Sequence, residues 1–355
     1  MSAVHVVVPA GIDDPGGPSG GNTFDRAVCD GLPAHGWAVR VHEVAGPWPR
    51  ADRAARVALT AVLAGIPDGA VVLLDGLVAC ALPEVLVPAR YRLRTVVLVH
   101  LPQGHAASTA HRAEDRTRER GVLQCAAAVV STSRWTREWL VRTYCLAPGS
   151  VHVVTPGVAS ADLVLAHASG GRLLCVAAVA PHKGHDVLVE ALAAVKDLSW
   201  SCTCVGSVAV DASFTADVRT LARAAGLGDR IAFSGPLTGD SLSAAYAAAD
   251  LVLVPSRTET YGMVVTEALA RGIPVVGSDV GGLPEALDGP CPAPRPGILV
   301  APGDAVALAG AVRRWLTDPT LRHTLQASAA QRRTTLSGWA VTARQLSHVL
   351  AEVAA

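Results

Sequence analysis

Two glutamates eight residues apart, Glu259 and Glu267, are the strongest candidates for chemistry in this sequence. An apolar run ends just before Glu259, which falls in a polar loop, and the helix-like stretch that follows carries Glu267. Gly262 lies between them and permits close approach of the backbone. Free amides at the start of such a helix would point at an anion between the two carboxylates. The alternative is a solvated helix face, but Glu267 stands among apolar neighbours, where an unpaired carboxylate is costly.

Lys183 is the second candidate, and it is one of only two lysines in the chain. It follows an apolar, strand-like run and directly precedes Gly184 and a helix-like stretch. A lysine at the carboxyl end of a strand is well placed to pair with a phosphate as a point charge. A merely solvating lysine is the alternative. The neighbouring His182 and His185 have no carboxylate ligand set, which favours loop polar groups over metal ligands.

The first half of the chain offers a histidine and a pair of glycines. His100 ends an apolar run, which predicts an imidazole at the crevice end of a strand, with a core-edge histidine as the alternative. Gly20 and Gly21 follow the first strand-like run and precede a helix, so their backbone amides can meet an anion or a sugar hydroxyl. A plain strand-to-helix turn is the other interpretation. The GxGxxG spacing of dinucleotide sites is absent, which counts against a nicotinamide enzyme.

The elements that must position these residues alternate between short β-branched runs and longer Ala- and Leu-rich stretches, which predicts an α/β fold with parallel sheets. The expected strands are residues 4–8, 38–44, 71–74, 95–99, 128–131, 151–154, 172–177, 201–205, 231–234, 251–254, 274–277 and 297–300. The clearest expected helices are residues 23–35, 186–195, 213–225, 241–249, 263–271 and 305–317. The charged run Glu114–Arg120 is expected to be a solvated loop and helix face.

Two consecutive strand series predict two domains of similar size. We expect an N-terminal domain over residues 1–162 and a C-terminal domain over residues 163–338. An amphipathic helix is expected from residue 339 to the end at 355, and packing back onto the first domain is one of its two options.

Composition excludes several classes of protein. The 30 basic and 30 acidic residues balance, so no field is expected that would attract nucleic acid or an anionic membrane. The eight cysteines have no zinc-ligand spacing, which favours reduced thiols in a cytoplasmic protein without a structural metal. The longest apolar region, residues 57–87, is interrupted by prolines and acidic residues, so we predict no transmembrane segment. We also predict no signal peptide.

Taken in order and spacing, the motifs resemble the retaining nucleotide-sugar glycosyltransferases of family four, including bacterial ones. The resemblance rests on Ser19-Gly20-Gly21, Gly36-Trp37-Ala38-Val39, His100, Ser131-Thr132-Ser133, Pro156-Gly157-Val158, Pro181-His182-Lys183-Gly184, Gly235, the segment from Ala249 to Glu285, and Pro302-Gly303-Asp304. It implies the GT-B architecture, in which two Rossmann-like domains with parallel sheets face each other across an interdomain cleft. It is nearly silent about substrate, because fold does not fix function.

The resemblance implies a donor site in the second domain. Lys183 would hold the donor diphosphate, Glu259 would contact hydroxyls of the transferred sugar, and Glu267 would hydrogen-bond the ribose. The loop containing Gly235 and Leu237 would receive the base. Backbone amides contacting phosphate and sugar would come from Thr260, Tyr261, Gly262, Met263 and Val264.

In the first domain the resemblance implies that His100 contacts the transferred sugar, and that Gly20 and Gly21 let this domain close on the diphosphate. Asn22 and Thr23 would face the acceptor. One departure is an alanine pair, Ala177-Ala178, where the family usually has Gly-Arg, so one of two expected diphosphate-binding cations is missing.

The implied reaction is retaining transfer of a hexose from a nucleoside-diphosphate sugar, UDP- or GDP-linked, to a hydroxyl of a small molecule, lipid or natural product. Lys183 and a helix N-terminus would stabilise the leaving diphosphate, so no metal and no cofactor are expected. Two alternatives stay open: a GT-B sugar-nucleotide epimerase or hydrolase, and a noncatalytic sugar-nucleotide sensor. The sequence does not identify the base, the sugar, the acceptor or the oligomeric state.

Overall fold

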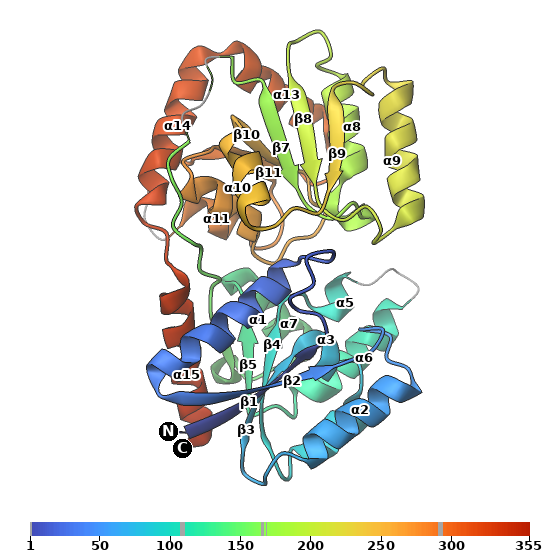
Figure 1. The fold of residues 1–355 in the computed structure, drawn as a ribbon, viewed down its shortest axis with the longest axis vertical. Helices are drawn as coiled ribbons and strands as arrows, with labels where there is room; N and C mark the ends of the chain where they lie inside the picture. The colour runs from blue at the N-terminus through green and yellow to red at the C-terminus, as the bar shows by residue number, and fades with distance from the viewer. Residues whose placement is uncertain (1, 107–110, 165–166, 168, 290–293) are drawn as a thin grey trace. The chain divides into compact units, whose positions relative to one another are not determined.

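A computed structural model describes residues 2–106, 111–164, 167, 169–289 and 294–355 of the chain. The chain divides into two compact units, each built around its own six-stranded parallel sheet (Figure 1). Unit 1 comprises residues 1–13, 19–157 and 338–355, and unit 2 comprises residues 14–18 and 158–337. The predicted α/β class with parallel sheets is therefore confirmed.

The sheet of unit 1 has the strand order β2-β1-β3-β4-β5-β6. Its strands are β1 (Ser2–Pro9), β2 (Trp37–Val44), β3 (Val71–Asp75), β4 (Arg94–Val99), β5 (Ala128–Ser131) and β6 (Val151–Val153). Its helices are α1 (Gly20–Gly31), η1 (Leu32–His35), α2 (Arg53–Ala64), α3 (Gly76–Ala79), α4 (Pro83–Ala89), α5 (Gln103–Ala106), α6 (Arg112–Leu123), α7 (Arg134–Tyr144), η2 (Pro148–Ser150) and α15 (Trp339–Ala354).

The sheet of unit 2 has the order β12-β11-β10-β7-β8-β9. Its strands are β7 (Arg172–Val176), β8 (Ser201–Val205), β9 (Ile231–Gly235), β10 (Leu251–Val254), β11 (Val275–Ser278) and β12 (Gly297–Val300). Its helices are η3 (Pro181–Lys183), α8 (His185–Ala193), α9 (Ala212–Ala224), α10 (Gly239–Ala247), α11 (Met263–Ala270), α12 (Leu283–Asp288), α13 (Ala305–Thr317) and α14 (Pro319–Arg333).

Each sheet has a core on both faces, as its almost purely apolar inner strands require, whereas the edge strand β2 carries polar residues and is partly exposed. In unit 1, Val6 and Leu73 face a core shared with α1 and α15, whereas their neighbours Val7 and Leu74 face a core shared with α2, α4, α6 and α7. In unit 2, α8, α9 and α13 cover one face, and α10, α11 and α12 cover the other. No helix among the described residues is long and apolar enough to span a bilayer.

The structure moves two predicted boundaries. The division between the units falls after Gly157 rather than after residue 162, because the following segment is held along unit 2. Within that segment, Ala161 accepts a hydrogen bond from the Arg333 guanidinium at 2.6 Å, and the Val164 amide donates to the carbonyl of Arg271 at 2.9 Å. The final helix α15 packs in unit 1, where Thr342 bonds Thr155.

The first helix also begins three residues earlier than expected. Ser19 caps α1, because its hydroxyl accepts from the amide of Asn22 at 3.1 Å. The two glycines Gly20 and Gly21 therefore lie inside the first turn of the helix rather than before it.

Candidate active site

The strand order of each sheet places its candidate residues at one edge. Unit 2 has the order 3-2-1-4-5-6 of Rossmann-like sheets, and its strand order reverses between β7 and β10. Ligands bind such sheets outside the carboxyl ends of the strands at this point. Lys183 follows β7 and Glu259 follows β10, so the two candidates flank the switch point.

Lys183 and Glu259 form an ion pair there. The Lys183 Nζ lies 2.8 Å from the Glu259 Oε2, and the Ser256 hydroxyl is 3.4 Å from the same oxygen. The two side chains are 24% and 15% exposed, so the pair is sheltered but within reach of a ligand. The structure therefore brings together the two charged residues that the sequence assigned to the same site.

Backbone contacts fix the loops that carry this pair. The Arg257 amide donates to the carbonyl of His182 at 2.8 Å, which ties the loop after β10 to the loop after β7. Gly184 has φ of +71°, and a Cβ added there would lie 2.1 Å from the Pro255 carbonyl oxygen. Only glycine permits this approach. These backbone contacts thus set the position of Lys183 relative to Glu259.

A third loop, after β11, contacts the backbone of Glu259. The Gly282 amide donates to the carbonyl of Glu259 at 3.2 Å, and a Cβ on Gly281 would lie only 1.6 Å from that carbonyl oxygen. Helix α11 then begins after Gly262, which has φ of +91°, and no side chain caps it. Its first amides, at Met263 and Val264, have no intrahelical partner, as at every helix start.

Buried and half-buried residues complete this edge. Thr260 and Tyr261 are buried, and burial raises the pKa of Tyr261 to about 12, so Tyr261 offers the site its backbone rather than a charged side chain. Glu267 lies one turn into α11, where its Oε2 accepts from the Tyr246 hydroxyl at 2.6 Å. Burial raises the pKa of Glu267, and the hydrogen bond from Tyr246 and the charge of Arg271 partly offset that rise.

Gly235 and Leu237 lie farther along the sheet. Gly235 ends the edge strand β9 with φ of +78°, and its carbonyl accepts from the Gly206 amide at 2.9 Å. Leu237 is half-buried against the core that contains Tyr246. These residues lead into α10, the helix that carries the partner of Glu267.

Two neighbouring basic side chains, those of Arg257 and His182, offer no available positive charge at this edge. The Arg257 guanidinium forms a bidentate ion pair with Asp186, at 2.8 and 2.7 Å, and also donates to the Pro181 carbonyl. Burial, and then the charge of Lys183, lower the pKa of His182, which keeps its ring neutral. Of the three basic side chains Lys183, Arg257 and His182, Lys183 is therefore the cation that is paired with another residue of the predicted site, Glu259.

In unit 1 the candidate residues gather around His100, just after β4. The His100 Nε2 lies 2.9 Å from an oxygen of Asp25 on α1 and 4.0 Å from an oxygen of Asp75 at the end of β3. A Cβ on Gly21 would lie 3.2 Å from the His100 ring, so Gly21 lets the ring pack flat against α1. The Phe24 ring meets the imidazole edge-on.

The other predicted residues of unit 1 lie on the same first turn of α1. Gly20 and Thr23 are exposed, and Asn22 is half-buried. The Thr23 hydroxyl donates to the carbonyl of Ser19 at 3.0 Å. Their predicted contact with an acceptor stays a prediction.

Sequence reasoning missed Asp25 and Asp75. Both are almost fully buried, and donor atoms of Asp25, Asp75 and His100 lie within 4.8 Å of one another, which is a geometry that metal ligands also adopt. A signal was present, because Asp75 ends an apolar strand at its carboxyl end and Asp25 lies on the apolar face of α1 beside Phe24 and Val28. The prediction that no metal is used stays a prediction.

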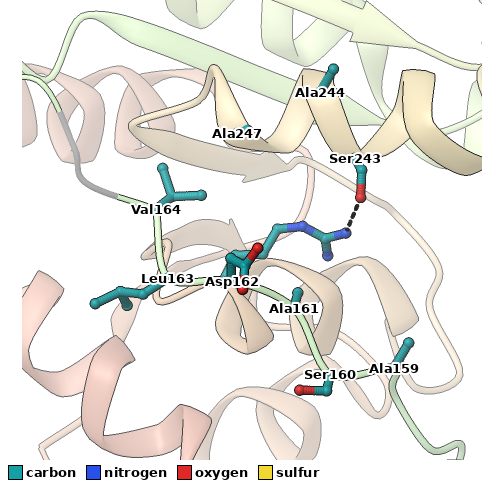
Figure 2. Close-up of a pocket in the computed structure, with 10 residues that line it drawn as sticks. Ala159, Ser160, Ala161, Asp162, Leu163, Val164, Ser243, Ala244 and Ala247 are labelled. Carbon is teal, nitrogen blue, oxygen red and sulfur yellow. Dashed lines mark hydrogen bonds between the residues drawn. The ribbon is translucent and has the colours of Figure 1, made fainter.

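A separate pocket of about 680 Å³ lies on unit 2 and contains none of the predicted residues. Figure 2 shows its lining from the segment 159–164 and from α10. Arg271 also lines the pocket, and its guanidinium donates to the Ser243 hydroxyl at 3.0 Å. Apart from Arg271, its polar side chains are Ser160, Asp162 and Ser243. It does not converge polar groups on one point, so it is not the candidate active site.

Comparison with known proteins shows a similarity to glycosyltransferases. Residues 168–332 match the family model described as glycosyl transferases, group 1. The chain is 34% identical over 261 residues to a D-inositol 3-phosphate glycosyltransferase of Salinispora tropica, and the matched region covers 67% of this chain and 53% of that protein. It is 30% identical over 246 residues to the protein of the same name in Corynebacterium diphtheriae, covering 64% and 56%. The chain thus spans about half the length of the curated relatives it matches.

Solved structures share the whole fold at lower identity. A sucrose-phosphate synthase from Thermosynechococcus elongatus has a TM-score of 0.80 at 23% identity, and covers 99% of both chains. Anabaena HepE, solved in complex with UDP and glucose, has a TM-score of 0.78 at 16% identity, and covers 99% of this chain and 100% of its own. The predicted GT-B fold is confirmed. Residues 168–332 are thus similar to the group 1 glycosyl transferases, in agreement with the predicted resemblance to the family-four enzymes.

Proposed function

We propose that this chain is a retaining, metal-independent glycosyltransferase that moves a sugar from a nucleoside-diphosphate sugar to an acceptor hydroxyl. The observation that carries the proposal is the Lys183–Glu259 ion pair at the switch point of the unit 2 sheet, beside the uncapped start of α11. Similarity to the group 1 glycosyl transferases and the UDP and glucose bound by HepE support a nucleotide-sugar donor.

In this mechanism the bond between the sugar C1 and the diphosphate breaks, and its electron pair stays on the diphosphate. Lys183 and the amides at Met263 and Val264 stabilise the negative charge that develops there. The acceptor hydroxyl forms the new C1–O bond on the face that the diphosphate leaves, and its proton passes to a phosphate oxygen. Configuration at C1 is retained, and no metal takes part.

The other residues bind and orient the donor. Glu259 accepts hydrogen bonds from sugar hydroxyls, and Glu267, held by Tyr246, accepts from the ribose. The base occupies the loop around Gly235 and Leu237. His100 contacts the sugar, Gly20 and Gly21 approach the diphosphate, and Asn22 and Thr23 contact the acceptor. UDP or GDP is the expected nucleotide, and a cytoplasmic location remains a prediction.

Arg257 does not replace the missing family arginine at Ala178 in this proposal, because its guanidinium is paired with Asp186. Lys183 is then the main side-chain cation on the diphosphate from unit 2. Its loss removes a charge-assisted interaction of roughly 3 kcal/mol, which is about a hundredfold in rate.

A thermal-shift screen against UDP, GDP, ADP and TDP tests the donor site first. A ligand that binds only the folded protein raises Tm in proportion to log affinity, so the cognate nucleotide will give the largest shift. Lys183→Ala is expected to abolish most of that shift. Lys196→Ala, which removes the only other lysine, exposed beyond α8, is the matched control and should keep it. If no nucleotide shifts the wild type, or if the two variants respond alike, the proposed donor site is wrong.

The reaction class is tested with the matching nucleotide sugar in excess EDTA. Transfer to a hydroxyl acceptor with retained configuration supports the proposal, and a requirement for added magnesium contradicts it. Incubation with donor alone separates the alternatives, because an epimerase or hydrolase would yield an epimer or free sugar without acceptor. A sensor would bind the nucleotide and turn nothing over.

A further inference from the structure

His100 is enclosed on one side by two buried carboxylates from different elements. Asp25 on α1 contacts the ring Nε2 at 2.9 Å, and Asp75 at the end of β3 lies 4.0 Å from the same nitrogen. The carboxylate side chains are 2% and 3% exposed, whereas the His100 ring is 14% exposed. Within the described residues the ring Nδ1 has no hydrogen-bond partner.

Asp75 and the loop after β4 are held by contacts that do not involve the His100 ring. Asp75 caps α3, because its Oδ1 accepts from the Leu77 amide at 2.6 Å. Gln103, three residues after His100, donates from its side chain to the carbonyl of Gly76 at 3.0 Å, which ties the loop after β4 to the same turn. Asp25 keeps one oxygen, Oδ2, buried without a partner. Asp75 therefore stays in place whatever the charge of the ring, whereas the Asp25 carboxylate is hydrogen-bonded to the ring itself.

We propose that Asp25 and Asp75 are positioning residues that keep His100 protonated, so that His100 presents a fixed cation and an N–H donor to the bound ligand rather than a base. That the ligand is a sugar nucleotide rests on the proposed function, whereas the charge of the ring does not.

Charge balance is the first argument. A neutral His100 would leave the buried Asp25 carboxylate without a counter-ion, which costs several kcal/mol in a protein interior. Burial by itself lowers the pKa of His100, but the attraction and hydrogen bond of Asp25, with the attraction of Asp75, raise it to about 9. Among the described residues, Asp25 and Asp75 are the groups whose charges act on the ring, and Gly21 and Phe24 supply uncharged contacts from α1.

Two carboxylates face a single histidine ring, so the charge of the second one, Asp75, also has to be accounted for. Burial and the repulsion of Asp25 raise the pKa of Asp75 to about 7, against the opposing effects of His100 and the Leu77 amide. At neutral pH Asp75 is therefore partly protonated, which lessens the negative charge buried beside His100. With Nε2 directed at Asp25, the Nδ1–H is left to donate to an acceptor oxygen of a ligand.

The test is a pH titration of the histidine side chains by NMR, with His100 identified from a His100→Gln sample. In the wild type, His100 is expected to titrate near pH 9, about 2.5 units above an unperturbed histidine. Asp25→Asn preserves the shape of the side chain and is expected to bring the pKa of His100 to 6.5 or below. Asp30→Asn, an exposed acid farther along α1, is the matched control and should leave the titration unchanged.

Asp75→Asn provides an independent variant if Asp25→Asn does not fold, and it should lower the pKa of His100 by less, because its carboxylate is farther away. With a donor in hand, transfer by Asp25→Asn is expected to acquire a fall between pH 6 and 8 that the wild type lacks. A His100 that titrates near 6.5 in the wild type, or that ignores both substitutions, would overturn the proposal. So would Zn²⁺ binding to His100 at neutral pH, since a metal displaces the ring proton.

Discussion

Substituting Gly281 tests whether the loop after β11 positions Glu259. A Cβ added at Gly281 would lie 1.6 Å from the Glu259 carbonyl oxygen, and a real Cβ atom essentially never lies within 3.0 Å of such a non-bonded atom. Gly281→Ala must therefore move the two loops apart by about 1.4 Å. Because Glu259 is paired with Lys183, the displacement reaches both charged groups of the candidate site.

Two effects of this substitution have to be separated. Gly281 has φ of +60°, so alanine there also adopts a left-handed conformation that costs roughly 1–2 kcal/mol. Gly303 has φ of +80° and no atom within 4 Å of an added Cβ. Gly303→Ala thus pays the backbone cost without the clash. A misplacement of about 1 Å can cost a hundredfold in rate, so only Gly281→Ala is expected to lose function on that scale.

The measurements are urea unfolding for stability, calorimetric titration of the nucleotide selected by the screen, and the transfer rate. We expect Gly303→Ala to lose about 1–2 kcal/mol of unfolding free energy and keep the wild-type affinity and rate. Gly281→Ala should lose more stability and about tenfold or more in affinity, with a larger fall in rate. Equal stability and unchanged binding in the two variants would refute the claim that this contact sets the position of Glu259.

Three further predictions concern single contacts. Ala178→Arg should tighten nucleotide binding about tenfold in calorimetry if the position still points at the diphosphate, and unchanged affinity contradicts that. Tyr246→Phe leaves the Glu267 carboxylate without its partner and should lower the unfolding free energy by about 1–3 kcal/mol in urea titrations, whereas no loss would mean that Glu267 is solvated. Folding raises the pKa of Asp75 from 3.8 to about 7, so the folded protein keeps a proton that the unfolded chain releases between these pH values. The free energy of unfolding of the wild type should therefore fall relative to that of Asp75→Asn as pH rises from 4 to 7, by at most about 1.4 kcal/mol per pH unit. Parallel curves of unfolding free energy against pH would show that Asp75 does not titrate in this range.

The strands were predictable because parallel, doubly covered sheets leave a strong signal. Runs such as Val71–Leu74 and Leu251–Val254 are continuous, apolar and β-branched, and the structure begins and ends them within a residue or two of the expected positions. Most helix starts were also predictable, because α8, α9, α10, α11 and α13 begin within two residues of the expected positions, but α1 begins three residues early. The cap at Ser19 depends on a side-chain geometry that composition does not reveal.

The charged run Glu114–Arg120 contains buried residues that the local sequence did not predict. It was predicted to be solvated, yet on α6 Asp115 and Glu119 are buried. Glu119 accepts from the amides of Gln103 and Gly104 at 2.9 and 3.0 Å, so it holds the loop that follows His100. Acidic residues are almost never buried unless they are paired. Their partners here lie 15 or more residues away, which no local pattern contains.

The candidate site divides in the same way. Lys183, Glu259 and Glu267 were found because each interrupts an apolar context at a strand end or helix start. Their partners were not all found, because Tyr246 and Asp25 reach the site from helices whose packing depends on the tertiary fold. The sequence thus indicated which residues carry charge, while the structure determines which charges neutralise one another.

That pairing bears on how a diphosphate would be held in the proposed function. Among the described residues near the switch point, Lys183 is paired with Glu259, Arg257 is paired with Asp186, and His182 is neutral. A diphosphate therefore gains a cation from unit 2 side chains only as Lys183 turns from Glu259 toward it. The Glu259 carboxylate is half-buried, so it would then need new donors, and the hydroxyls of the transferred sugar are of the right chemistry. In the proposed function, binding of the diphosphate and recognition of the sugar would be coupled through the Lys183–Glu259 ion pair, because the diphosphate would take over Lys183 while the sugar hydroxyls would satisfy Glu259.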